Sequence, residues 1–205
     1  MNHYENIQFS VKNLVDLYKD NLGWSVDDDF VIPEHNPDCG CSEDDFFAQE
    51  VPYSEKYNYD AIMEYFAGVV GGEVVLQVDD NDYQGDSRVL FRSKDGFFGL
   101  LFFGWGSCSG CDWLQGCSSW KELQELFNSM WKDIVWYENA QGCLDYINQK
   151  DWDLDSAFHR SETKEFLDKA VEELEKAAEE QAKKCAGAVQ QFQEESEEAL
   201  FLGKN

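Results

Sequence analysis

The sequence predicts an α+β fold in which helices flank a small antiparallel sheet and a long helical segment follows at the C-terminus. Three short runs with strand character succeed one another between residues 73 and 104, with turn-forming residues between them. Apolar residues recur at helical spacing on both sides of these runs. From Ser161 onward Glu, Lys and Ala dominate, as is typical of a solvent-exposed helix.

The elements follow in order along the chain. Residues 97–104 are almost wholly apolar, so we expect a central strand that is covered on both faces. Ser118 or Ser119 is expected to cap the helix that begins near residue 118. Gly187 is expected to divide the last helix in two. The predicted helices are 3–21, 54–67, 118–132, 140–150 and 161 onward, and the predicted strands are 73–78, 87–92, 97–104 and 134–137.

The last helix carries its own pattern. The favoured i,i+4 order of acid before base predicts the ion pairs Glu165–Lys169, Glu172–Lys176, Glu179–Lys183 and Glu180–Lys184. Its apolar stripe is rich in small residues, which would allow close packing on the body or self-association with another copy of the chain. Cys143, among the apolar positions of the preceding helix, is expected to be a core residue.

Length and composition suggest one domain with an appendage. The chain has 205 residues, of which 43% are hydrophobic and 15% aromatic, enough for a substantial core. We place the domain at residues 1–158 and an acidic helical segment at residues 159–205. No apolar leader and no run of about 18 apolar residues is present, so a cytoplasmic location without membrane contact is expected.

Charge is the most unusual property of the sequence. The 42 Asp and Glu residues exceed the 16 Lys and Arg residues and give a net charge of −26. This excess argues against direct binding to nucleic acid, which needs cations, and against anionic membranes. It favours a basic partner or a protein surface that normally holds nucleic acid, although acidity can also serve solubility alone.

Residues 24–60 combine many acids with interleaved aromatic side chains. A long acidic segment of this kind inside a domain needs something that ties it down. Its carboxylates could imitate the phosphates of nucleic acid, and its aromatic rings could anchor a partner. The residues that we predict to bind the partner are Asp44, Asp45, Phe46 and Phe47.

Cysteine spacing predicts a structural zinc site after the central strand. Cys108 and Cys111 have the spacing of a zinc knuckle, and Gly110 permits the tight turn. Cys39 and Cys41 could supply the second pair, which would staple the acidic segment to the sheet. The alternates are Cys117 and His35, and the competing interpretation is that these cysteines are free and buried.

Catalytic signatures are scarce. Of the three histidines, His159 could be paired with Cys108 on paper, but nothing in the sequence brings the two together. No P-loop, dinucleotide fingerprint or nucleophile elbow is present. The loop over residues 79–86 does not follow the EF-hand order and is expected to be solvated. We therefore expect a non-enzymatic protein, with a zinc- or thiol-dependent hydrolase as the less favoured alternative.

The segment Gly106-Ser107-Cys108-Ser109-Gly110-Cys111-Asp112, with Tyr83-Gln84-Gly85-Asp86 before it and Leu114-Gln115 after it, resembles a phage and prophage protein family of largely unassigned function. The resemblance covers roughly residues 73–137. In acidity, size and expected zinc, the chain resembles the anti-CRISPR inhibitors of type II RNA-guided nucleases.

The second resemblance implies a small phage- or prophage-encoded inhibitor that acts in the bacterial cytoplasm. Its partner would be a type II CRISPR effector nuclease, which holds nucleic acid in a basic channel. Binding would block DNA loading or cleavage. The resemblance implies no catalytic residue in this chain. A phage accessory zinc-binding protein for another basic partner is the alternative.

Overall fold

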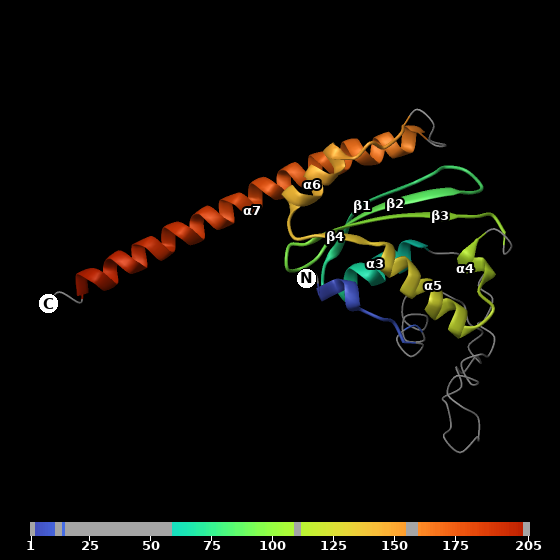
Figure 1. Cartoon of the computed structure of the whole chain (residues 1–205), viewed down its shortest axis with the longest axis horizontal. Coiled ribbons are helices and arrows are strands. Elements are labelled where there is room, and N and C mark those ends of the chain that lie inside the picture. Colours follow the sequence, from blue (N-terminus) through green and yellow to red (C-terminus); the bar gives the residue numbers. More distant parts are fainter. Residues whose placement is uncertain (1–2, 11–13, 15–58, 109–111, 155–159, 203–205) are drawn as a thin grey trace, which may run out of the picture.

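The computed structural model describes residues 3–10, 14, 59–108, 112–154 and 160–202, and it has the α+β architecture that the sequence predicts (Figure 1). A four-stranded antiparallel sheet lies between helices, and a long helix follows at the C-terminus. The described elements are η1 (His3–Asn6), α3 (Tyr59–Val69), β1 (Glu73–Asp79), β2 (Gly85–Arg92), β3 (Phe98–Trp105), α4 (Trp113–Gly116), α5 (Trp120–Asp133), β4 (Val135–Tyr137), α6 (Ala140–Gln149) and α7 (Arg160–Leu202).

The strands follow one another in the order β1-β2-β3-β4, so β2 and β3 are central. The β2–β3 pair is in register from Gly85 opposite Trp105 to Arg92 opposite Phe98. Strand β4 is short and pairs only with the first residues of β3, from Phe98 to Leu100. All the predicted strands are confirmed, with small shifts at their ends.

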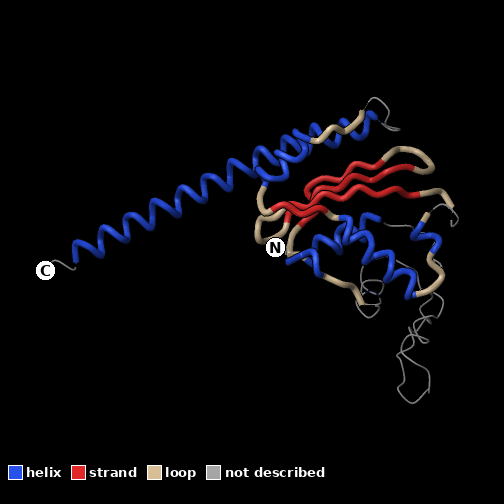
Figure 2. The backbone as a smooth tube through the Cα atoms, in the orientation of Figure 1, coloured by secondary structure: helices blue, strands red, loops and turns tan. Residues whose placement is uncertain are grey.

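Both faces of the sheet are covered by helices (Figure 2). Because side chains alternate along a strand, Val89 and Phe91 of β2 enter one core and Leu90 enters the other. Helices α3 and α5 cover the first core, which includes Phe66, Leu101, Phe127 and Trp131. Helices α6 and α7 cover the second, which includes Phe98, Leu100, Cys143, Phe166 and Leu174. The prediction that the apolar strand is covered on both faces is confirmed.

The N-terminal segment differs from the predicted helix over residues 3–21. A single 3-10 turn is followed by non-helical residues 7–10. Leu14 is helical, and its N–H donates to the Ser10 carbonyl at 3.2 Å, while residues 11–13 and 15–21 lie outside the described part. Residues of this segment also bond to α5. Trp131 Nε1 donates to the Tyr4 carbonyl at 2.8 Å, and Asn128 Oδ1 accepts from the Phe9 backbone N–H at 2.8 Å. At Tyr4 and Phe9 these long-range partners take the place of helical hydrogen bonds.

Helix α7 runs through Gly187 without the predicted break. A glycine inside a helix costs about 1 kcal/mol, which is too little to end a helix of this length. The first half packs into the second core, and Gln181 is its last anchor, accepting from the Ala140 N–H at 3.1 Å and donating to the Gly96 carbonyl at 3.1 Å. Beyond Gln181 the described side chains are exposed and the helix projects from the body (Figure 1).

The predicted ion pairs on α7 are partly formed. Glu165–Lys169 and Glu179–Lys183 are present at 2.6 and 3.4 Å. Lys176 pairs with Glu173 instead of Glu172, and the Glu180–Lys184 pair is not among those of the described residues. Self-association through the exposed part of α7, where Val189 is 58% exposed, stays a prediction. None of the described helices, α7 included, is long and apolar enough to cross a membrane.

A buried ion pair fastens the β1–β2 loop to the start of α7. Arg88 Nη1 donates to Asp80 Oδ1 at 2.7 Å, and Arg88 Nε donates to Thr163 Oγ1 at 2.9 Å. The second oxygen of Asp80 accepts from the Asp86 N–H at 2.6 Å. Gly85 is required beside it, because a Cβ there would lie 2.4 Å from Asp80 Cβ. The loop was expected to be solvated, but this part of it is an internal ionic contact.

Replacement of Arg88 with methionine should lower the free energy of unfolding by about 3–5 kcal/mol, because it leaves the buried Asp80 carboxylate without its cation. Urea denaturation followed by circular dichroism measures this loss. Arg92→Met is the matched control, since the Arg92–Glu73 pair is exposed and should contribute less than about 1 kcal/mol. Equal losses for the two variants would contradict the role assigned to Arg88.

Candidate functional site

Most residues of the predicted site lie outside the described part of the chain. This holds for Cys39, Cys41 and Cys111 of the zinc set, for the alternate His35, and for Asp44, Asp45, Phe46 and Phe47 of the partner-binding set. Cys108 is described and exposed, and Cys117 is half-buried. Within the described residues, no three Cys, His, Asp or Glu side chains lie together as a metal site, and the predicted ligand set stays a prediction.

The loop that connects β3 to α5 is organised by the carboxylate of Asp112, whose residue is only 3% exposed. Asp112 Oδ2 accepts from the Gly106 N–H at 2.9 Å, and Oδ1 accepts from the Gln115 N–H at 2.8 Å, which caps α4. The Asp112 N–H donates to the Cys108 carbonyl at 2.8 Å. Asp112 therefore joins the backbone at Gly106, directly after β3, to the start of α4.

Tyr59 completes this arrangement from helix α3. Its hydroxyl lies 3.0 Å from each carboxylate oxygen of Asp112, to which it donates. Its ring packs against Phe103 of β3, with centroids 5.0 Å apart. Burial and the charge of Asp112 raise the pKa of Tyr59 well above its ordinary value. Tyr59 was one of the aromatic residues expected in the acidic segment, and its contacts are internal ones.

Helix α5 begins with a capping box. Ser119 accepts from the Glu122 N–H, and the Glu122 carboxylate accepts in return from the backbone N–H of Ser119 at 3.1 Å. Ser118 donates to the same carboxylate through its N–H at 2.6 Å and its hydroxyl at 2.7 Å. These hydrogen bonds lower the pKa of Glu122 and keep it ionised. Of the two predicted caps, Ser119 is confirmed.

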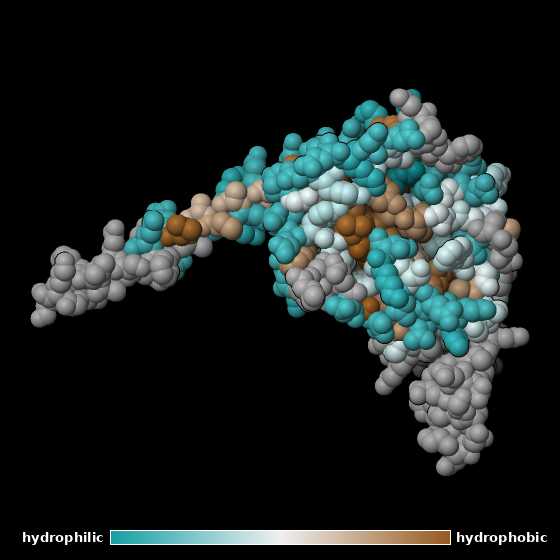
Figure 3. All heavy atoms as spheres, in the orientation of Figure 1, coloured by the Kyte–Doolittle hydropathy of each residue, from teal (hydrophilic) through white to brown (hydrophobic). Residues whose placement is uncertain are grey.

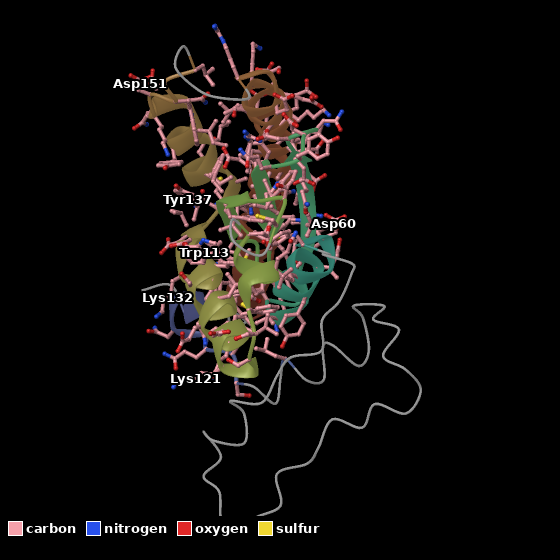
Figure 4. The ribbon with its side chains drawn as sticks, turned by 90° about the vertical axis from the view of Figure 1, so that its right-hand side faces the viewer. Asp60, Trp113, Lys121, Lys132, Tyr137 and Asp151 are labelled. Atoms are coloured by element: carbon pink, nitrogen blue, oxygen red, sulfur yellow. The ribbon has the colours of Figure 1, made fainter. Side chains whose placement is uncertain are left out.

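A shallow groove of about 370 Å³ lies between α4 and α5. Trp113, the first residue of α4, forms one wall and is 68% exposed; α4 lies on the side that Figure 4 turns to the viewer. Trp113 was not among the predicted site residues, because the exposure of a tryptophan, a residue type that is highly buried on average, does not follow from the sequence. The groove is lined by Trp113, Gly116, Cys117, Glu122, Glu125, Leu126 and Ser129.

Cys117 lies in this groove as a protonated thiol. Burial, followed by the charges of Glu122, Asp112 and Glu125, raises its pKa to about 11. Its sulfur donates to the Trp113 carbonyl at 3.2 Å, a bond that only the thiol can make. At neutral pH Cys117 is therefore a weak nucleophile and a poor thiolate ligand.

The structure describes a second hollow, of about 470 Å³, between the β2–β3 turn and α7. Its lining carries both signs of charge, with Arg92, Lys94 and Lys184 beside Glu73 and Glu180. Neither a cation nor an anion is clearly favoured there. Cys143 lies outside both hollows, fully buried in the second core, and burial raises its pKa to about 12. Its prediction as a core residue is confirmed.

Tyr59→Phe should destabilise the protein by about 1.5–3 kcal/mol, because it removes a hydrogen bond to a buried carboxylate and nothing else. Thermal or urea unfolding measures the effect. Tyr83→Phe is the control, since Tyr83 is 85% exposed and the change there should be close to zero. If Tyr59→Phe is as stable as the unchanged protein, Asp112 is held without Tyr59.

The cysteines should react with iodoacetamide in the order of their exposure and pKa. At pH 8, Cys185 should be labelled quickly, while Cys117 should lag because its raised pKa leaves little thiolate at that pH. Cys143 should react only after unfolding. Peptide mass spectrometry over time gives the order, and rapid labelling of Cys117 in the folded protein would show that its environment is not the one described.

The comparisons with known proteins give no relative from which a function could be transferred. No protein-family model, no curated protein and no solved structure matches this chain. The features that bear on function are the charge of the chain and the geometry around Asp112, Trp113 and Cys117.

Proposed function

We propose that the protein is a non-enzymatic inhibitor that binds a basic, nucleic-acid-handling protein, and that this partner is a type II CRISPR effector nuclease. The observation that carries the proposal is the net charge of −26. It would let the protein compete with nucleic acid for a basic channel and so block DNA loading or cleavage. The resemblance to anti-CRISPR inhibitors supports the choice of nuclease, and evasion of host defence would be the biological role.

The described ion pairs leave this net charge unchanged, because each joins one cation to one carboxylate. Arg88 is buried against Asp80, and Arg92 pairs with Glu73. Lysines of α7 are likewise neutralised by acids one turn away on the same helix, in the pairs Lys164–Asp168, Lys169–Glu165, Lys176–Glu173 and Lys183–Glu179. The excess of 26 negative charges remains after this pairing, so an approaching basic surface meets a strongly negative field.

Part of the acidic surface lies on α3 and β1. Gln77 Nε2 donates to Asp60 Oδ1 at 2.7 Å and to Asp79 Oδ2 at 3.0 Å, so one neutral amide holds two exposed carboxylates near each other. Asp82 and Asp86 are also exposed, on the adjoining hairpin. Hydrophilic side chains cover much of the face seen in Figure 3. Spaced carboxylates of this kind support binding to a groove that normally holds phosphates.

A structural zinc ion is part of the proposal, held by Cys39, Cys41, Cys108 and Cys111. Two observations support it. The hydrogen bond from Asp112 to the Cys108 carbonyl supports the described end of the knuckle, and the Cys108 side chain is exposed. The raised pKa of Cys117 makes this alternate the poorer donor. The ion would cross-link the acidic segment to the sheet.

Zinc can be tested on the purified protein. We expect about one zinc per chain by elemental analysis, and slow alkylation of Cys108 that becomes fast when a chelator removes the metal. Cys185 is the matched control, because it is exposed but is no predicted ligand. Absence of metal together with rapid labelling of Cys108 would contradict the zinc site and leave the charge argument intact.

Inhibition is tested by adding the protein to a type II effector nuclease with its guide RNA and target DNA. We expect DNA cleavage to fall with rising inhibitor concentration, and the inhibition to weaken as salt is raised. Charge reversal at Asp44 and Asp45 should weaken inhibition. Charge reversal at the exposed Glu138 and Asp145 changes the net charge equally and should have less effect.

The outcomes separate the alternatives. Unchanged cleavage with excess protein at low salt would refute the proposed partner. Capture of another basic protein under the same conditions would favour the phage accessory protein. Zinc-dependent hydrolysis of a substrate by the purified chain would refute the non-enzymatic proposal.

A further inference from the structure

We propose that the groove between α4 and α5 binds an arginine side chain of the basic partner. In this arrangement the guanidinium group stacks on the indole of Trp113, and the carboxylates of Glu122 and Glu125 accept its hydrogen bonds. The inference deepens the proposed function, on which it rests for the basic character of the partner. It adds a particular contact to an interaction otherwise described only by charge.

Trp113 is an exposed residue on a fixed backbone. Asp112, which precedes Trp113, accepts from the Gly106 N–H through its buried carboxylate at 2.9 Å, and the Trp113 carbonyl accepts from the Cys117 thiol at 3.2 Å. The indole itself remains 68% exposed. A large ring on an ordered backbone loses little entropy when a partner covers it, which is why tryptophan often dominates binding energy in interfaces.

The charged side chains that line the groove beside the Trp113 ring are negative. Glu122 and Glu125 line the groove, and neither lysine of α5, Lys121 or Lys132, is among the lining residues. Burial is the largest cause of the raised pKa of Cys117, and the charges of Glu122, Asp112 and Glu125 raise it further. A cation entering the groove would be favoured both by these neighbours and by the net charge of the chain.

Among cationic side chains, arginine fits this groove best. A planar guanidinium group can stack on an indole and still donate from its edge to carboxylates, whereas a lysine ammonium is a compact, strongly hydrated charge. Leu126 and the half-buried Cys117 give the groove an apolar part, against which the alkyl stem of an arginine can pack. Arginine and tryptophan are both enriched among the residues that dominate interfaces.

The test uses the full-length chain and a capped Gly-Arg-Gly peptide, followed by NMR of the tryptophan indole N–H signals. The matched probe replaces arginine with citrulline, which has nearly the same shape and no charge. We expect the arginine peptide to shift the Trp113 signal in a saturable way and the citrulline peptide to have far less effect. Trp113→Ala identifies the signal by its loss.

Variants define the contribution of each group, with the backbone amide signals of α4 and α5 as the readout. Trp113→Ala should weaken binding about two- to thirtyfold. Glu125→Gln should weaken it up to about fivefold, and so should Glu122→Gln, in which glutamine can keep the capping box. Tyr83→Ala, at an exposed aromatic residue outside the groove, should leave binding unchanged.

Equal responses to arginine and citrulline would overturn the proposal and indicate a site for an apolar or neutral group. Failure of the arginine peptide to shift Trp113 at millimolar concentrations would overturn it as well. The proposed function fails separately, if nuclease cleavage is unaffected by the protein. In that case arginine binding at Trp113 would still point to a basic partner other than the nuclease.

Discussion

The central strands of this protein are buried on both faces, and the other elements are arranged around that constraint. Neighbouring residues of β2 enter different cores, so no polar face is available on this strand. Two of its buried side chains are polar, Ser87 and Arg88, each with 2% exposure, and only Arg88 carries a charge. A charge there requires a carboxylate and further acceptors, which Asp80, the Asp86 carbonyl and Thr163 supply. One residue thereby couples the sheet, its first hairpin loop and the start of α7.

The candidate site depends on a comparable buried carboxylate in the loop that follows β3. Asp112 is a buried carboxylate whose acceptors are occupied by backbone N–H groups and by Tyr59. The hydrogen bonds to the Asp112 carboxylate fix the loop after β3, and this loop places Trp113 on the surface beside Glu122 and Glu125. The groove is therefore a product of the fold and does not depend on a bound ligand. Its acidic and aromatic character matches the overall charge of the chain.

Sequence patterns predicted the elements whose stability is local or periodic. The strands, helices α5 and α6, and the Ser119 cap follow from alternation, helical spacing and capping chemistry. The predictions that differ from the structure depend on distant partners. Tyr4 and Phe9 bond to Trp131 and Asn128 of α5. Asp80, in the loop expected to be solvated, pairs with Arg88 inside the protein. Trp113 was missed because its surroundings come from packing. The predicted ligands Cys39, Cys41 and Cys111 lie outside the described residues, so their pairing with Cys108 is not decided by the fold.

The projecting half of α7 gives the molecule an elongated outline (Figure 1). At 1.5 Å per residue, a helix of 43 residues is about 65 Å long, well over the diameter of a compact body of this mass. Such an arm increases hydrodynamic drag without adding mass. A monomer should therefore elute early in gel filtration and resemble a dimer of a compact protein. Its stoichiometry with any partner is better taken from light scattering or sedimentation equilibrium, which report mass independently of shape.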